Sequence, residues 1–131
     1  MVIKLNTVSS TPIYVQLRNQ IVLGIGCGEL EVGERLPTVR QMAQDIGVNT
    51  LTVQKAYEIL KIEGYIEIDR RHGARVNPAV NLSGQFQEKI EHELTLLVSE
   101  SLLKGMSRDD FMDLCGKVFN RVSFNKPVNI T

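Results

Sequence analysis

The chain has 131 residues, 43% of them hydrophobic and 23% charged, and its fifteen basic and fifteen acidic residues cancel. These totals are ordinary for a soluble globular protein of one or two small domains. No apolar run approaches the ~20 residues that span a bilayer and no signal peptide is evident, so we expect a cytoplasmic protein without membrane contact. The two distant cysteines, Cys27 and Cys115, are expected to be buried or free thiols. The neutral balance does not favour a nucleic-acid binder, so any DNA-facing charge must be local.

The first predicted helix follows an extended arm over residues 1–10. Thr11 suits the N-cap and Pro12 the first helical position, because the missing proline N–H costs nothing there. Glycines end this helix near Gly28, and a connector over residues 29–36 follows. Apolar residues recur every four positions on one face of the helix, namely Ile13, Leu17, Ile21 and Ile25.

Two further helices are predicted on either side of a glycine turn. Thr38 suits the N-cap of the first, in a reciprocal capping pattern with Gln41, and Gly47 supplies the left-handed residue that ends it. Asn49 suits the N-cap of the next helix, which is expected to run to about Glu63. The inward residues are Val39, Met42, Ala43 and Ile46 in the first helix and Val53, Ala56, Tyr57 and Leu60 in the second.

A β-hairpin is predicted after Gly64. Residues 65–69 alternate as a half-buried strand does, and Gly73 allows a tight reversal into residues 74–76. Three helices followed by a hairpin are typical of a winged helix-turn-helix, which places its last helix in the major groove of DNA.

Two longer helices are expected after a linker at Pro78 and residues 81–84. An apolar face spans residues 82–102, Gly105 ends that helix, and Ser107 caps the next one. Two helices cannot bury both apolar faces alone, so the winged module, a second copy of the chain, or both must cover them. The expected dimerisation residues are Phe86, Ile90, Leu94, Leu97, Leu102, Phe111, Leu114 and Val118.

The predicted fold is mainly α with a small β-hairpin wing. A winged helix-turn-helix DNA-binding domain over residues 1–80 precedes a C-terminal two-helix dimerisation unit over residues 81–131.

The candidate DNA contacts lie at the starts of two helices and at the hairpin tip. Asn and Gln can pair with adenine, Lys with guanine or phosphate, and Leu with a thymine methyl group, while hydroxyls near a helix N-terminus suit phosphates. Each also has a simpler interpretation as a cap or a solvated side chain. The candidates are Thr38, Arg40, Asn49, Thr50, Leu51, Thr52, Gln54, Lys55, Arg70, Arg71 and His72.

Other function classes have weaker support. The sequence has no glycine-rich phosphate loop, no pair of histidines at ligand spacing and no CxxC motif, so it predicts neither an enzyme nor a metal or cofactor. A winged-helix protein–protein interaction module, whose wing arginines meet an acidic partner, is the competing interpretation, and the neutral net charge favours it. A small-molecule effector bound between the winged domain and the C-terminal helices, or in a dimer cleft, is a further alternative.

Several motifs, in order across roughly residues 10–76, resemble the GntR family of bacterial transcription regulators. They are Pro12–Gln16, Gly33–Arg40, Gly47–Asn49, Thr52–Tyr57, Leu60 and Glu63–Ile66, followed by a wing that ends in Gly73. The short C-terminal part resembles the YtrA-like subfamily, which implies that its helices dimerise and that the regulated genes include transporter operons.

The resemblance implies a sequence-specific, homodimeric regulator of double-stranded DNA, a repressor at an inverted repeat. Thr50 and Gln54 stand where many relatives have Arg, and Thr50-Leu51 departs from the Asn-Pro-Asn that is frequent in the subfamily, so the operator sequence should differ. The family's DNA contacts fall on Arg40, Asn49, Thr50, Thr52, Gln54, Lys55, His72 and Gly73.

Overall fold

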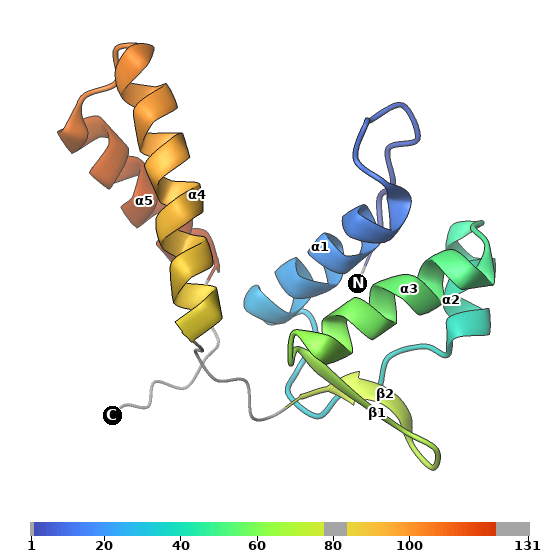
Figure 1. The fold of residues 1–131 in the computed structure, drawn as a ribbon. Coiled ribbons are helices and arrows are strands. Elements are labelled where there is room, and N and C mark those ends of the chain that lie inside the picture. The colour runs from blue at the N-terminus through green and yellow to red at the C-terminus, as the bar shows by residue number, and fades with distance from the viewer. Residues whose placement is uncertain (1, 78–83, 123–131) are drawn as a thin grey trace. The chain divides into compact units, whose positions relative to one another are not determined.

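The structure is a computed structural model that describes residues 2–77 and 84–122. The elements fall into two compact units, α1 to β2 and α4 to α5. The mainly α fold with a hairpin wing is therefore confirmed. In chain order the elements are α1 (Ile13–Gly26), α2 (Val39–Ile46), α3 (Thr50–Ile62), β1 (Ile66–Asp69), β2 (Gly73–Val76), α4 (Gly84–Leu103) and α5 (Arg108–Val122), as Figure 1 shows.

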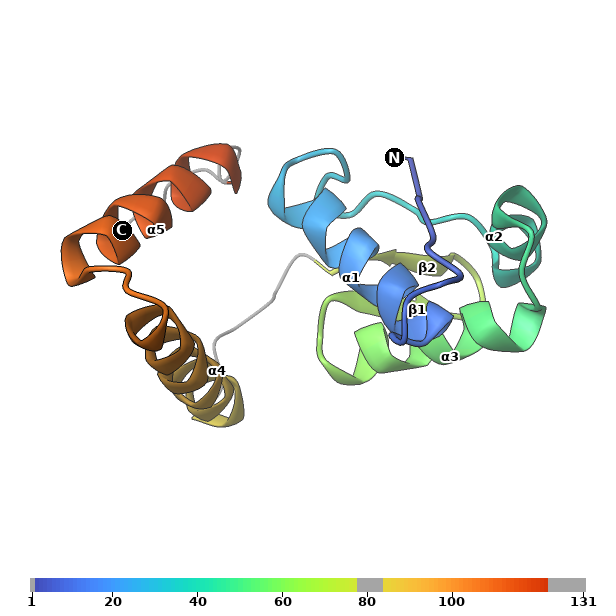
Figure 2. The ribbon, with the colours of Figure 1, turned by 90° about the horizontal axis from the view of Figure 1, so that it is seen from above.

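The core of the first unit lies between α1, α3 and the hairpin. Helices α1 and α3 pack along one another, and α2 crosses the start of α3 (Figures 1 and 2). Each fully buried aliphatic side chain contributes about 1.5–3 kcal/mol to the free energy of unfolding. The predicted inward stripes of α1, α2 and α3 supply most of this core. Its largest fully buried side chains are Leu17, Ile21, Val53, Leu60, Ile66 and Val76.

Side-chain and glycine caps set the ends of α2 and the start of α3. Thr38 Oγ1 accepts the backbone N–H of Gln41 at 3.0 Å, and Asn49 Oδ1 accepts the N–H two residues on at 2.7 Å. Gly47 adopts the predicted left-handed conformation, with φ of 71°. The reciprocal half of the cap was wrong. The Gln41 side chain donates instead to the Asp45 carboxylate at 2.7 Å, because that acceptor lies one turn along the same helix face.

The start of α1 also differs from the prediction. Thr11 was expected as the N-cap, but α1 begins at Ile13 with Pro12 as its N-cap, and no side chain caps it. Thr11 is held outside the helix because Gln16 Nε2 donates to its carbonyl oxygen at 2.8 Å. The same amide donates to the carbonyl of Asn6 at 2.9 Å, so this glutamine fastens the N-terminal arm to α1.

The connector between α1 and α2 adds a third, edge segment to the hairpin, which the sequence pattern did not predict. Arg35 forms an antiparallel bridge with Arg75, and the N–H of Leu36 donates to the carbonyl of Ala74 at 2.8 Å. Leu30 and Leu36 are buried as a result, at 5% and 3% exposure. The segment is short and flanked by glycine and proline, so no strand alternation marks it.

Tyr57 ties α3 to the segment that precedes α2. Its hydroxyl donates to the carbonyl oxygen of Pro37 at 2.8 Å, and burial raises the pKa of that hydroxyl well above its usual range. We expect Tyr57→Phe to lower the free energy of unfolding by about 1–2 kcal/mol, because a partly buried carbonyl loses its partner. Urea denaturation measures the loss.

Tyr65→Phe is the matched control for that substitution. The Tyr65 ring lies under the Arg18 guanidinium, 5.4 Å from ring centroid to carbon, and phenylalanine keeps this contact. Equal urea midpoints for the Tyr57→Phe variant and the unmodified protein would contradict the role given to the Tyr57 hydroxyl.

The second unit is a pair of helices joined by a turn at Gly105, whose φ is 92°. Ser107 Oγ accepts the N–H of Asp110 at 3.1 Å, so the predicted cap of α5 is confirmed. Gly84 is the first residue of α4, so the predicted linker was wrong at its last residue. The rest of that linker, with Pro78 and Leu82, lies outside the described residues. Neither α4 nor α5 contains a buried residue.

Candidate nucleic-acid interface

The exposed side of α3 lies opposite its buried stripe. The predicted residues Asn49, Thr50, Leu51, Gln54 and Lys55 are all exposed there, and Thr52 is half-buried. Leu51 is 69% exposed, although a leucine in the first turn of a short helix would usually be buried. This side therefore offers amide, hydroxyl and methyl groups, which are the groups that read base edges. Gln54 donates to Glu58 at 3.5 Å, a long bond that leaves the amide available to a base.

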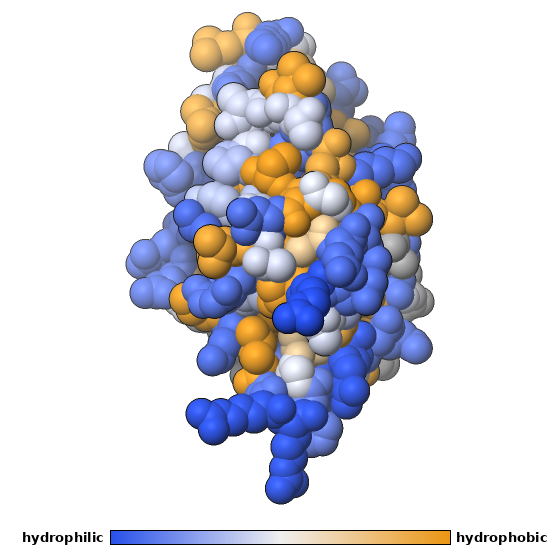
Figure 3. Space-filling model, turned by 90° about the vertical axis from the view of Figure 1, so that its right-hand side faces the viewer, coloured by the Kyte–Doolittle hydropathy of each residue, from blue (hydrophilic) through white to orange (hydrophobic). Residues whose placement is uncertain are grey.

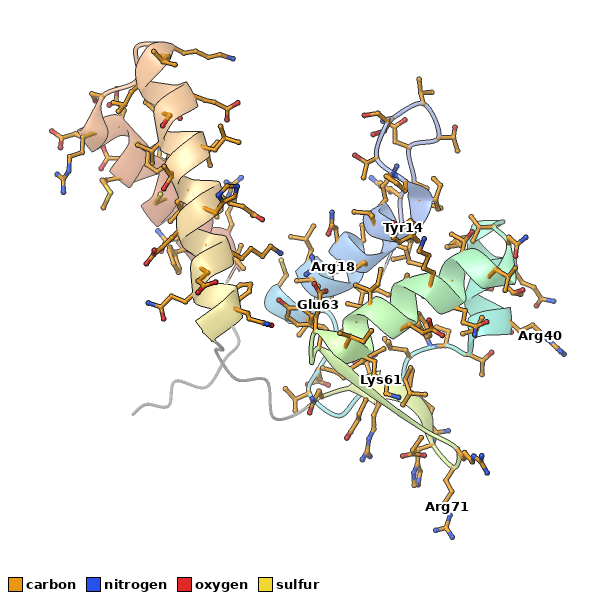
Figure 4. The ribbon with its side chains drawn as sticks, in the orientation of Figure 1. Tyr14, Arg18, Arg40, Lys61, Glu63 and Arg71 are labelled. Atoms are coloured by element: carbon orange, nitrogen blue, oxygen red, sulfur yellow. The ribbon has the colours of Figure 1, made fainter. Side chains whose placement is uncertain are left out.

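Lys55 is fixed in place by α1. Its Nζ lies 4.0 Å from the centroid of the Tyr14 ring, and Figure 4 shows Tyr14 on α1 beside α3. A cation–π contact at an exposed site contributes about 0.5–1 kcal/mol and reduces the freedom of the lysine chain. The structure therefore places this ammonium on the flank of α3 toward α1. That position suits a phosphate beside the recognition helix better than a base in front of it.

The start of α2 presents one unpaired cation. Arg40 lies in the first turn of α2, and Figure 4 shows its side chain extending outward from the helix. Its guanidinium makes no ion pair within residues 2–77 and 84–122. Thr38 is occupied as the cap, so its oxygen orients the helix start while the hydroxyl proton remains free to donate. Arg40 is thus ready to bind an anion or a guanine edge.

The tip of the wing is organised by Asp69. Its Oδ1 accepts the N–H groups of Arg71 and His72 at 2.8 and 2.6 Å, and its Oδ2 lies 3.2 Å from His72 Nδ1. The backbone bond from His72 is the main cause that lowers the pKa of Asp69. The stabilisation from this carboxylate is present above its unfolded pKa and is lost as the pH falls through the lowered folded value. Gly73 closes the tip with φ of 68°.

The wing tip carries the remaining predicted cations. Arg70 and Arg71 are exposed, and neither forms an ion pair in the part of the chain that the structure describes. Arg75 lies lower on the hairpin and is paired with Glu67 at 2.9 Å. Figure 3 views the side on which α2 and the wing lie in Figure 1, and strongly hydrophilic side chains project from its lower end. The hairpin tip thus supplies a local positive charge in a neutral chain.

The sequence reasoning missed two residues of this surface. Lys61 is exposed seven positions after Gln54, on the same side of α3, and lies between α3 and the hairpin in Figure 4. Its helical spacing could have identified it. The second is Asp69, which holds the tip and was not among the predicted site residues. An aspartate followed within a few residues by glycine is a turn signal that could have indicated this role.

Asp69 is expected to affect DNA binding in two opposite ways, because it orders the wing tip but also places a negative charge there. Asp69→Asn keeps the oxygen that accepts the two backbone N–H groups but removes a negative charge from the tip. We expect it to lower the Kd for DNA roughly twofold to fivefold in moderate salt. Asp69→Ala removes the acceptor as well, so the tip loses its order and the Kd should not fall. Fluorescence anisotropy compares the two, and equal affinities of the Asn and Ala variants would contradict the organising role.

The predicted dimerisation residues form exposed apolar faces on α4 and α5. Leu97 and Leu102 are 52% and 58% exposed, and Phe111 is half-buried. Further exposed apolar side chains, which the prediction left out of this set, are Leu96, Leu103, Met112 and Phe119. In the part of this unit that the structure describes, the predicted residues are half-buried or exposed.

Other kinds of site find no support among the described residues. Within residues 2–77 and 84–122 no three His, Cys, Asp or Glu side chains are grouped so that they could hold a metal ion. None of the helices described is both long and apolar enough to cross a membrane. Both cysteines are free thiols, with Cys27 exposed and Cys115 half-buried.

Comparison with known proteins gives consistent matches. The family model for bacterial regulatory proteins of the gntR family matches residues 10–76. The HTH-type transcriptional repressor YtrA of Bacillus subtilis is 34% identical over 106 residues, which cover 79% of this chain and 82% of the repressor. YtrA from Sulfolobus acidocaldarius, a GntR-family transcription factor, is 35% identical with a TM-score of 0.62, covering 79% of this chain and 99% of that one. A transcriptional antiterminator from Listeria monocytogenes EGD-e shares the fold with a TM-score of 0.85 over 98% of both chains, at 24% identity.

Proposed function

Because this chain belongs to the GntR family of bacterial regulatory proteins, in its YtrA-like subfamily, and is a DNA-binding transcription regulator, we propose that it acts as a homodimeric repressor at an inverted-repeat operator. The relatives it matches are named transcriptional regulators and not enzymes. The name of the Bacillus subtilis relative supports repression, and the subfamily resemblance favours a transporter operon as the target. Such a regulator works where the chromosome lies, in the cytoplasm.

In this proposal the two parts of the chain have different functions. Residues 1–80 bind DNA and residues 81–131 join two copies. Helix α3 enters the major groove, where Asn49, Leu51 and Gln54 face bases. The hydroxyls of Thr38, Thr50 and Thr52, with Lys55, face phosphates near the helix starts. Arg40 approaches from α2, and the tip residues Arg70, Arg71, His72 and Gly73 meet the neighbouring minor groove or its phosphates.

The proposal of a dimer is supported mainly by one observation: neither α4 nor α5 contains a buried residue. Two helices that bury none of their residues have no core of their own, so this unit needs a partner surface to cover its apolar side chains. A second copy would bring the same apolar stripes and close a four-helix bundle. Two winged heads related by a two-fold axis then reach half-sites about 34–36 Å apart, one turn of DNA.

An anisotropy titration with labelled duplex from upstream of its own gene tests this function. We expect specific binding in the nanomolar range and a Kd that rises steeply with salt, because phosphate contacts release counterions. A scrambled duplex of equal length and composition is the control and should bind about a thousandfold more weakly. Weak binding of both duplexes with equal affinity would contradict a sequence-specific regulator. A small-molecule effector in the dimer cleft would show as a rise in Tm in a ligand screen.

A further inference from the structure

A cavity of about 680 Å³ lies in the first unit, apart from the DNA-reading side chains described above. Its walls come from the N-terminal arm, connector residues 34–37 and one side of α2. The arm and the connector cross one another in the view of Figure 2, and both line the cavity. Sites for small ligands have volumes of about 300–1,000 Å³, so this cavity has room for a ligand of several residues.

The connector presents the free edge of the sheet to this cavity. Arg35 lies opposite Arg75. On one side of Arg35 the N–H of Leu36 donates to the carbonyl oxygen of Ala74, and on the other side the N–H of Val76 donates to the carbonyl oxygen of Glu34, each at 2.8 Å. In such an antiparallel pair the N–H and C=O of the residue between the bonds point away from the partner strand. Neither group of Arg35 has a backbone partner in the residues that the structure describes. The wall therefore offers a donor and an acceptor at strand spacing.

The rest of the lining combines an apolar floor with a charged rim. Leu30, Leu36 and Met42 are at most 5% exposed and form part of the floor. Arg35 and Asp45 are exposed at the rim, and within the described ranges neither makes an ion pair. The exposed carboxylate of Glu34 also lines the cavity, so a ligand that matched this lining would carry apolar side chains, an amide main chain, and groups of both charges.

We propose that this cavity binds a short apolar peptide in an extended conformation. The main chain of the peptide pairs with the free N–H and C=O of Arg35 and adds a strand to the sheet edge, which is a recurring mode of peptide recognition. The peptide carboxylate meets the Arg35 guanidinium, its ammonium meets Asp45, and its apolar side chains lie against the more exposed apolar lining of Val2 and Ile3. A fatty acid lacks the main-chain groups, and a single amino acid leaves most of the volume empty.

The position of the cavity couples the peptide to DNA. One wall is α2, whose first turn carries Arg40, while Asp45 and Ile46 at its other end line the cavity. Because this helix carries both Arg40 and part of the cavity lining, a bound peptide is expected to change DNA affinity, and peptide affinity then changes by the same factor. Such coupling typically amounts to about fivefold to 150-fold in affinity. The lining of the cavity is complete without DNA, so peptide binding can be measured on the free protein.

Isothermal titration calorimetry of the full chain, without DNA, tests the site with a leucine–valine–leucine tripeptide. We expect saturable binding of one peptide per chain. Arg35→Gln and Asp45→Asn should each weaken it about tenfold, since each removes one charge-assisted hydrogen bond. Asp113→Asn, an exposed aspartate on α5, is the matched control and should leave the affinity unchanged. The same peptide with methylated amide nitrogens cannot pair with the sheet edge and should not bind.

The outcomes separate this site from the proposed function. No saturable heat at millimolar peptide would overturn the site, and so would equal binding of the methylated peptide or of all three variants. Circular dichroism confirms that the variants are folded, which is expected because both rim residues are exposed. Since the titration contains no DNA, its failure leaves operator binding intact, and a failed operator titration leaves the peptide result intact.

Discussion

Leu94→Glu is expected to convert the dimer to a monomer and to weaken operator binding by about two orders of magnitude or more. Leu94 lies in the middle of the apolar face of α4 and is 43% exposed in the single chain. In the proposed dimer this face is covered, and an unpaired carboxylate there would cost several kcal/mol. A monomer binds one half-site only. It therefore loses the DNA contacts of the second winged domain, and it loses the gain in affinity that comes from linking two DNA-binding domains.

Leu96→Glu is the matched control for this substitution. Leu96 is 59% exposed on the same helix, two positions along, and therefore points to nearly the opposite side. It should leave the dimer intact. Sedimentation velocity at micromolar concentration measures the mass of each variant, and anisotropy measures its affinity. A Leu94→Glu variant that sediments as a dimer would rule out this face as the interface.

The second large effect is expected from Arg40→Ala, which should raise the Kd for the operator about tenfold to a hundredfold. A guanidinium that contacts a base edge or a phosphate contributes about 1–3 kcal/mol. Arg40 is exposed and makes no ion pair in the described ranges, so its removal should not disturb the fold. If it contacts a phosphate, the salt slope falls by about one. If it reads a base, the preference for operator over scrambled DNA falls instead.

Arg108→Ala provides the control for Arg40. Arg108 is likewise exposed in the first turn of a helix, but on α5, outside the winged unit. It should leave the Kd and the salt slope unchanged. Equal Kd values for the Arg40 variant and the unmodified protein would remove Arg40 from the interface.

Helix periodicity and caps made much of this fold predictable. The stripe that contains Leu17 and Ile21, the cap residues Thr38 and Asn49, and the glycine that ends α2 depend on neighbours within one or two turns. Such features are encoded locally, so the sequence alone specifies them. The prediction of Thr11 as a cap was wrong because a side-chain contact, and not a backbone pattern, decides its position: the Gln16 amide holds Thr11 in the N-terminal arm.

The features that escaped prediction depend on contacts between distant segments. The bridge of Arg35 to Arg75 joins residues forty positions apart, and no alternation marks it in the sequence. Lys55 was predicted from its position on α3, but only the packing of α1 shows that its ammonium lies on the Tyr14 ring. The sequence pattern also predicted apolar faces on α4 and α5, and many of their apolar side chains are exposed in the single chain. What covers them could not be derived from one chain, because in the proposed dimer the covering atoms belong to another molecule.

Selection of bound sequences from a random pool of duplex DNA, with the full chain as bait, tests the central claim most directly. The account predicts enrichment of an inverted repeat whose half-sites lie about one helical turn apart, 34–36 Å. Because Asn49 and Gln54 present amide groups on the exposed side of α3, the half-site should contain adenine opposite them. Enrichment of a single, unrepeated half-site, or of no sequence at all, would contradict a two-fold dimer that reads DNA through α3.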